Sequence, residues 1–288
     1  RWTAARVDVT SGVKTLYYSR QSGVWGNQAQ WEDGASGFPN SNDHIAVIHD
    51  GDQITSDASR TLFAIIVIGD NGGGTASRLT IGANHTMTVG VGGVEIGDTV
   101  SAVNPTIVVN GNNAVLAPSA GLVLRPNGVL TIGSGGNNSR VNGGITAGVI
   151  SEGTININST NAAALSCGSF VATDGTVTQT DGPVTVAGAF EFSGDLWTMS
   201  DNVSLASSAT ASNTGNIYDA IFGSTNATVF RMSAGTLTFG ATSGANTVTA
   251  APTIIGTLEV DAGTLTTTNM GLLDAINGIH ADVLGWSL

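Results

Sequence analysis

The chain has 288 residues, only 10% of them charged, and 21 acidic against nine basic side chains give a net charge of −12. This balance argues against a nucleic-acid-binding protein, which needs clustered Lys and Arg to displace counterions, and against docking on an anionic membrane surface. Disorder is excluded as well, because the 40 glycines are interspersed with Val, Ile and Thr rather than with charged residues. No apolar run approaches the roughly 18 residues that a spanning helix needs, so we expect no membrane insertion.

Residues 1–42 form a predicted N-terminal segment that ends in a cap. The chain begins at Arg1 rather than at a methionine, as expected if an upstream piece has been removed, cleaved or lost; this fits secretion and a virion protein equally. Trp25 and Trp31 lie six positions apart and are followed by loop-forming residues, Pro39 and Asp43. Two indoles, each able to bury roughly 150–250 Å², would cover the open end of a fold that begins just after them. The alternative is an exposed platform on which sugars stack.

The body of the fold is expected over residues 43–268. Short alternating stretches such as "HIAVIHDG", "RLTIGANHTMTVG" and "GLVLRPNGVLTIGSGG" recur between glycine-marked corners, and no helical periodicity interrupts them for most of this length. The pattern is least regular at 207–232. These observations predict an all-β protein, either a single right-handed parallel β-helix (β-solenoid) or a β-sandwich or jelly roll.

The short strands and the glycine- and asparagine-rich corners favour the β-helix. Sequences typical of hairpins are few; "PNG" at 126–128 and "TDG" at 173–175 and 180–182 are the best examples. Threonine pairs are frequent but do not recur at a fixed interval, so a regular threonine array on one face is not predicted.

The last segment, residues 269–288, changes character. Apolar residues follow one another there at spacings of 4, 3, 4 and 3: Leu272, Ile276, Ile279, Val283 and Trp286. This spacing predicts a short amphipathic helix. The helix would cover the second open end of the solenoid, and self-association through the same apolar face is the alternative.

The stretch "GVWGNQAQWEDGASGFPNSNDHIAVIHDGDQIT" resembles the opening of β-helical phage virion proteins and bacterial surface proteins. The shared pattern is G-x-W, a second Trp six residues on, a glycine-rich loop and P-x-x-x-D, carried here by Gly23, Trp25, Trp31, Pro39 and Asp43. The resemblance is limited to about residues 22–70. It implies a solenoid on an exterior surface and transfers no catalytic residue.

One pair of carboxylates is a candidate for glycan cleavage. Glu191 and Asp195 lie beside Trp197, and β-helical tailspikes that degrade polysaccharides use paired acids. The favoured interpretation is that both acids are solvent-facing strand residues, because few basic residues are available nearby to complete a lyase site.

Other chemistry is poorly supported by the sequence. His44 and His49 are five residues apart, which places them on opposite faces of a strand, so a shared metal is not expected. Cys167 has no second cysteine to pair with and is predicted to be a buried structural thiol. We expect no cofactor.

Together these patterns predict a non-enzymatic structural or adhesive protein outside the cell. A component of a phage virion (tail, fibre or capsid decoration) is preferred over a bacterial adhesin or surface-layer component, with a tailspike-like enzyme as the rival. The expected partners are copies of the chain and other virion or surface proteins, with a cell-surface glycan as a further candidate.

Overall fold

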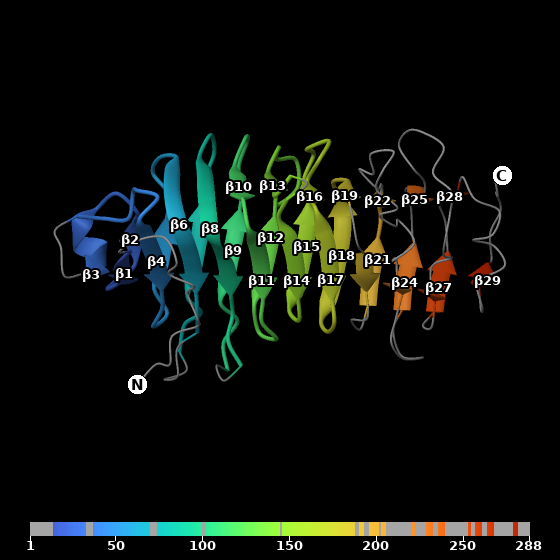
Figure 1. The fold of residues 1–288 in the computed structure, drawn as a ribbon, viewed down its shortest axis with the longest axis horizontal. Helices are drawn as coiled ribbons and strands as arrows, with labels where there is room; N and C mark the ends of the chain where they lie inside the picture. Colours follow the sequence, from blue (N-terminus) through green and yellow to red (C-terminus); the bar gives the residue numbers. More distant parts are fainter. Residues whose placement is uncertain are drawn as a thin grey trace.

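The fold is an elongated β-solenoid in which the coils stack along the long axis (Figure 1). The computed structural model describes residues 14–32, 37–69, 74–99, 102–144, 146–187, 190–192, 196–201 and 203–205. Further along the chain it describes the short strands at 221–222, 229–232, 236–239, 253–254, 257–260, 264–267 and 279–281. For 190–192, Met199 and everything from 203 onward, the description is limited to the backbone.

One side of the solenoid is a parallel sheet to which each coil adds one strand. Its 11 described strands follow the order of the chain, and we call it sheet 2. They are β2 (Gly23–Val24), β5 (Gln53–Thr55), β7 (Arg78–Ile81), β9 (Thr106–Val109), β12 (Val129–Ile132), β15 (Thr154–Asn158), β18 (Thr176–Asp181), β21 (Leu196–Met199), β24 (Val229–Met232), β27 (Thr257–Val260) and β29 (Ile279–Ala281).

The other side is sheet 1, with 18 described strands in two columns that merge at two long strands, β6 (Arg60–Val67) and β8 (Thr86–Ile96). The upper column in Figure 1 continues with β10 (Val115–Pro118), β13 (Arg140–Asn142), β16 (Leu165–Cys167), β19 (Val184–Val186), β22 (Val203–Leu205), β25 (Thr236–Phe239) and β28 (Thr264–Thr267). The lower column holds β1 (Thr15–Ser19), β4 (His44–Ile48), β11 (Gly121–Leu124), β14 (Gly148–Ser151), β17 (Ser169–Ala172), β20 (Phe190–Phe192), β23 (Ile221–Phe222) and β26 (Thr253–Ile254).

The core runs through the middle of the coils as stacks of apolar side chains. In sheet 2, Ile54, Leu79, Ile107, Leu130 and Ile155 occupy one register position on successive coils, and each is completely buried. Neighbouring strands lie about 4.8 Å apart, so each residue packs directly on its equivalent in the coil before it. In sheet 2, alternation in the sequence therefore becomes a row of inward apolar side chains and a row of mainly polar outward ones.

Glycine is required at the corner where the lower column passes into sheet 2. Gly128, Gly153 and Gly175 stack there, and a Cβ on Gly153 would lie 2.3 Å from the Gly128 carbonyl oxygen. Gly175 has a φ of +77°, and its Cβ would lie 2.0 Å from the carbonyl oxygen of Gly153. Backbone meets backbone at this corner, so no side chain fits.

Asparagines hold the corner between sheet 2 and the upper column. The Asn113 side chain donates to Asn84 Oδ1 at 3.2 Å, Asn138 donates to Asn113 Oδ1 at 3.2 Å, and Asn161 donates to Asn138. Asn84 and Asn113 adopt φ values of 60° and 58°, the left-handed region that asparagine tolerates better than most residues. The side-chain amides thus continue the hydrogen-bond ladder through the turn.

The N-terminal end departs from parallel stacking. After the short 3-10 helix η1 (Gln28–Gln30), strand β3 (Trp31–Glu32) pairs antiparallel with β1. Every other strand pairing in the described part of the chain is parallel, so the alternative of a β-sandwich or jelly roll built from hairpins is wrong. The fold class predicted from the sequence, a parallel β-solenoid, is confirmed.

The predicted C-terminal helix is wrong at the position where the structure describes it. Ile279 lies in strand β29, which extends sheet 2 by pairing parallel with β27. Of the same predicted face, Leu272, Ile276, Val283 and Trp286 lie outside the described residues. Within the stretch predicted to be irregular, 207–232, the described residues form β23 and β24. None of the helical segments among the described residues has the length and apolar character to cross a bilayer.

Candidate ligand-binding groove on sheet 2

Trp25 and Trp31 lie at the N-terminal end of the solenoid and are both buried, with 0% and 4% of their surface exposed. Their ring centroids are 4.8 Å apart and the ring planes are inclined by 61°. A sugar platform needs an exposed ring face, which neither residue offers. The alternative of a carbohydrate-stacking platform is therefore wrong for this pair.

Hydrogen bonds lock the two indoles into the loop that follows them. Trp25 Nε1 donates to the carbonyl of the buried Pro39 at 2.7 Å, and Trp31 Nε1 donates to the Trp25 carbonyl at 2.8 Å. The backbone N–H of Trp25 also donates to Thr55 O at 2.8 Å, which ties the segment to the next coil. The role of this segment as an end cap stays a prediction, which unfolding of a Trp25 variant can test.

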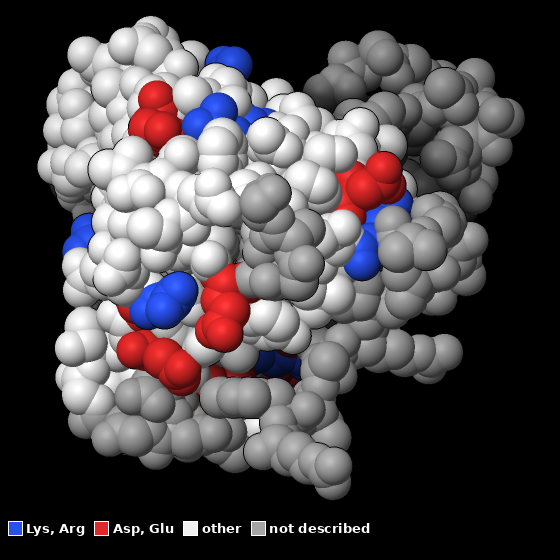
Figure 2. All heavy atoms as spheres, turned by 90° about the vertical axis from the view of Figure 1, so that its left-hand side faces the viewer, with Lys and Arg blue, Asp and Glu red and all other residues white. Residues whose placement is uncertain are grey.

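Asp43 marks the entry into strand β4 and pairs with the only lysine of the chain. Its carboxylate accepts from Lys14 Nζ at 2.5 Å, and Lys14 in turn lies 4.5 Å from the centre of the Phe63 ring. The hydrogen bond and the charge of Lys14 lower the pKa of Asp43 below its ordinary value. Figure 2 views this end of the molecule and shows acidic and basic side chains in small mixed groups rather than in a patch of one sign.

The structure bears on the candidate catalytic constellation only through Trp197 and the strand that holds Glu191, so the pair of carboxylates stays a prediction. Trp197 is completely buried, and its ring lies 5.2 Å from that of Phe170, so it packs in the core and cannot stack on a sugar. Glu191 belongs to β20 in sheet 1, whereas Trp197 belongs to β21 in sheet 2. Asp195 lies outside the described residues.

Two histidines and the cysteine contact neighbouring residues of the fold and do not form a metal site with other described residues. His44 accepts a hydrogen bond from the Asn40 N–H at 3.1 Å, and His49 Nδ1 lies 2.8 Å from Asp50 Oδ2. Within the described ranges, no group of three or more potential metal ligands comes together. The prediction of a buried thiol is confirmed, since Cys167 is 1% exposed and burial raises its pKa to about 12.

A serine and a histidine form the described arrangement most similar to a nucleophile and its base. Ser56 Oγ lies 2.8 Å from His85 Nδ1, but Ser56 is buried and also accepts from the Gly82 N–H at 2.9 Å. No described carboxylate is hydrogen-bonded to His85 to orient it as a base. This pair therefore holds the corner before the upper column in place.

The outer face of sheet 2 carries an ordered row of hydroxyl groups that the sequence did not reveal. One outward position on successive coils is occupied, in register, by Thr55, Thr80, Val108, Thr131, Asn156, Thr178 and Thr198. Threonine fills all of these positions but two. Apolar-Thr-apolar triplets such as "LTI" at 79–81 and 130–132 were the available signal, because they place threonine between two inward side chains.

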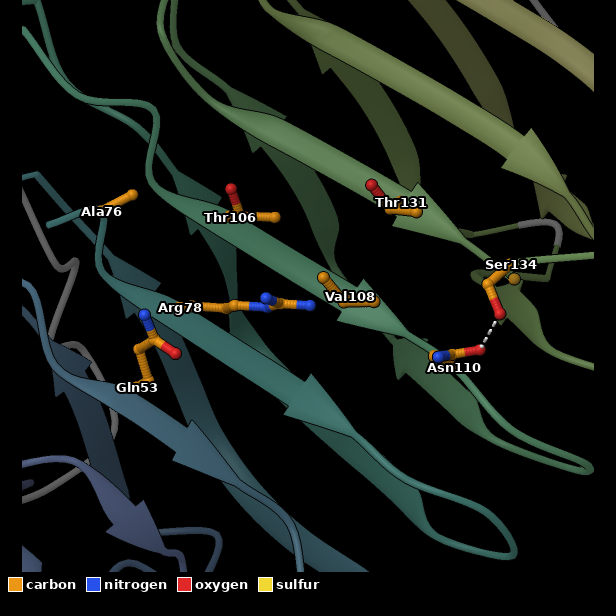
Figure 3. Close-up of a pocket in the computed structure, with 9 residues that line it drawn as sticks. Gln53, Ala76, Arg78, Thr106, Val108, Asn110, Thr131 and Ser134 are labelled. Carbon is orange, nitrogen blue, oxygen red and sulfur yellow. Dashed lines mark hydrogen bonds between the residues drawn. The ribbon is translucent and has the colours of Figure 1, made fainter.

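A shallow groove of about 430 Å³ opens on this face across β5, β7, β9 and β12 (Figure 3). Its lining is Gln53, Ala76, Arg78, Thr106, Val108, Asn110, Thr131, Gly133 and Ser134. Val108 and Ala76 supply apolar surface, and the remaining side chains present amides, hydroxyls and one guanidinium group. Among the features in the described part of the chain, this groove is the best candidate for a binding site.

Comparison with known proteins yields no relative. The chain has no significant match to a protein-family model, to a curated protein or to a solved structure.

Proposed function

We propose that this protein is a non-enzymatic structural or adhesive component of an exterior surface, and specifically of a phage virion, as a tail, fibre or capsid-decoration protein. The observation that carries the proposal is the continuous solenoid, whose inward side chains are used for packing and whose ligand-accessible groups lie on the lateral faces. Such a rod holds a repetitive polar face at a fixed geometry, which suits attachment.

The composition supports an extracellular location. The chain has few charged side chains, and its corners are formed by glycine and asparagine. Its single thiol is buried, so the fold does not depend on a reducing compartment. The resemblance of residues 22–70 to the opening of β-helical virion and bacterial surface proteins supports the same placement. A bacterial adhesin or surface-layer component is the alternative within this class.

The test is to locate the chain. Antibodies against the purified protein, applied to phage particles and to host cells and visualised by electron microscopy, should label the particle at one defined position. Label confined to the bacterial surface would replace the virion assignment with the adhesin alternative. Label confined to the cytoplasm would overturn the whole proposal.

The rival is a tailspike-like enzyme that uses Glu191 and Asp195. The buried position of Trp197 weighs against it, because the aromatic side chain of the constellation is unavailable to substrate. Incubation of the intact chain with host capsule should release no oligosaccharide. Release that disappears in the Glu191→Gln and Asp195→Asn variants would establish the enzyme and refute the non-enzymatic assignment.

A further inference from the structure

The groove on sheet 2 has the charge of an anion-binding site although the whole chain is acidic. Arg78 is the one charged residue among the nine that line it, and no carboxylate lies among them. The chain as a whole has a net charge of −12. Arg78 therefore gives the lining of the groove a positive charge in a molecule that is acidic as a whole.

The Arg78 guanidinium is exposed and makes no ion pair or side-chain hydrogen bond with any described residue. Three other described basic side chains are paired, Lys14 with Asp43, Arg60 with Asp57, and Arg125 with Glu95, whereas Arg20 and Arg140, like Arg78, form no ion pair with a described residue. Figure 3 shows the Arg78 side chain extended along the sheet toward Val108, over the surface of the groove. Its five N–H donors are thus available to a ligand that lies there.

The neutral groups around Arg78 are arranged to meet hydroxyl groups. Asn110 Oδ1 accepts from Ser134 Oγ and from Asn137 Nδ2, both at 2.8 Å, so its amide is held in one orientation. Its Nδ2 then remains to donate outward. Thr106 in β9 and Thr131 in β12 add hydroxyls, and Gln53 adds an amide at the β5 edge (Figure 3). The Thr106 hydroxyl donates to the Asn104 carbonyl at 2.8 Å, so it meets a ligand as an acceptor.

The dimensions of the groove suit an extended polymeric ligand rather than a compact cofactor. The groove crosses four strands, β5 to β12, which corresponds to about 14 Å at the spacing of a sheet. It is open to solvent along its length, whereas sites for small cofactors enclose most of the ligand surface. Val108, 7% exposed, gives an apolar floor on which the C–H face of a sugar can rest.

We propose that this groove binds a sparsely charged acidic glycan, with one sugar carboxylate held by Arg78 and neighbouring hydroxyls held by Asn110, Thr106 and Thr131. A guanidinium fits a carboxylate with two parallel hydrogen bonds. A densely sulfated polymer is disfavoured, because a net charge of −12 repels it and one arginine cannot offset its many charges. The inference deepens the proposed adhesive function and rests on it.

The test is binding of the full chain to an array of carboxylated, sulfated and neutral oligosaccharides. The chain should retain carboxylated members and bind their carboxyl-reduced counterparts at least tenfold more weakly. Arg78→Gln should weaken the same interactions by roughly tenfold or more, the usual effect of losing a charged hydrogen-bonded pair. Both differences should shrink as salt is raised.

Arg140→Gln is the matched control, because Arg140 is also exposed but lies in β13 of sheet 1, away from the groove. It makes the same change of charge and should leave binding unchanged. The proposal is overturned if no carboxylated member binds, if sulfated or carboxyl-reduced members bind as well as carboxylated ones, or if Arg78→Gln and Arg140→Gln behave alike. A chain that labels virions but fails this test loses the glycan site and keeps the structural role.

Discussion

Replacing Trp25 by phenylalanine tests whether the tryptophan segment stabilises the end of the solenoid. Trp25 is completely buried, and its indole N–H is the donor to the Pro39 carbonyl. A phenylalanine leaves that buried carbonyl unpaired, which costs about 1–3 kcal/mol. The smaller ring also leaves a void of about 40 Å³, worth about 1 kcal/mol at ~24 cal/mol per Å³. We therefore expect a loss of roughly 2–4 kcal/mol in the free energy of unfolding.

A more specific expectation concerns the part of the chain in which stability is lost. Each coil of a solenoid contacts only its neighbours, so a defect at one end loosens the adjacent coils first. Hydrogen exchange of the Trp25→Phe variant should accelerate in β1, β2, β4 and β5 and stay unchanged in β15 and β18. Urea unfolding followed by circular dichroism supplies the free energy.

The control is Val24→Ala, which changes the adjacent residue in the chain. Val24 is 47% exposed, so its truncation should cost less than about 0.5 kcal/mol. A Trp25→Phe variant as stable as Val24→Ala, or one in which exchange accelerates equally in every coil, would refute the assignment of Trp25 to the end of a one-dimensional stack.

Three further expectations concern the corners, the thiol and the ion pair. Gly175→Ala should lower the free energy of unfolding by ~2 kcal/mol or more, because its Cβ meets backbone of the preceding coil, whereas Gly136→Ala, at a similar positive φ but in open space, should cost only ~1 kcal/mol. Cys167, with a pKa of about 12 and a buried side chain, should react with iodoacetamide at pH 8 on the order of 1,000-fold more slowly in the folded chain than in urea. Asp43→Asn should destabilise the chain at pH 7, and the difference from the parent should vanish as the pH falls through the lowered pKa of Asp43, because protonation ends its pairing with Lys14.

Each of these expectations has an outcome that contradicts it. Equal losses in the two glycine variants would mean that backbone strain alone matters and that the coils are not in contact at the corner. Rapid alkylation of the folded chain would place the thiol at the surface. A pH-independent effect of Asp43→Asn would show that the carboxylate acts through something other than its charge.

The strands and their corners could be predicted because the signal is local. Alternation of apolar and polar residues gives the two faces of each strand, and a glycine directly after an inward residue marks the turn, as at Ile96 and Ile132. The sequences "PNG" and "TDG", the best hairpin candidates, are not hairpins in the structure. Gly128 and Gly175 turn the chain into the next face of the solenoid instead, and the strands before and after them lie in different sheets.

The register between coils could not be predicted, and the candidate groove depends on it. Equivalent core positions in sheet 2 fall at Ile54, Leu79, Ile107 and Leu130, so the number of residues per coil changes from one coil to the next. Corner loops of different length absorb the difference. Arg78 and Asn110 therefore line the same groove through the stacking of coils and not through any motif.

At Ile279, the described position of the predicted C-terminal helix, the prediction was wrong for a related reason. Spacings of 4 and 3 describe a helix face only if the segment folds by itself, and Gly278 and Gly285 each lower its helix propensity by about 1 kcal/mol relative to alanine. Sheet 2 ends in a strand with open hydrogen-bonding groups, and Ile279 and its neighbours pair with it through β29. At Ile279, pairing with the open edge of β27 outweighed the weak helical preference of the segment.

The antiparallel strand β3 covers part of the strand edge at the N-terminal end of the solenoid. A parallel solenoid exposes at each end a strand edge that an identical molecule could continue, which would convert a rod into a filament. At the N-terminal end, Glu32 and Trp31 occupy that edge opposite Tyr18 and Ser19, and they run against the strand direction that an incoming copy would need. At these two positions an incoming copy could not continue β1 in parallel, whereas β3 does not cover β2, the first described strand of sheet 2.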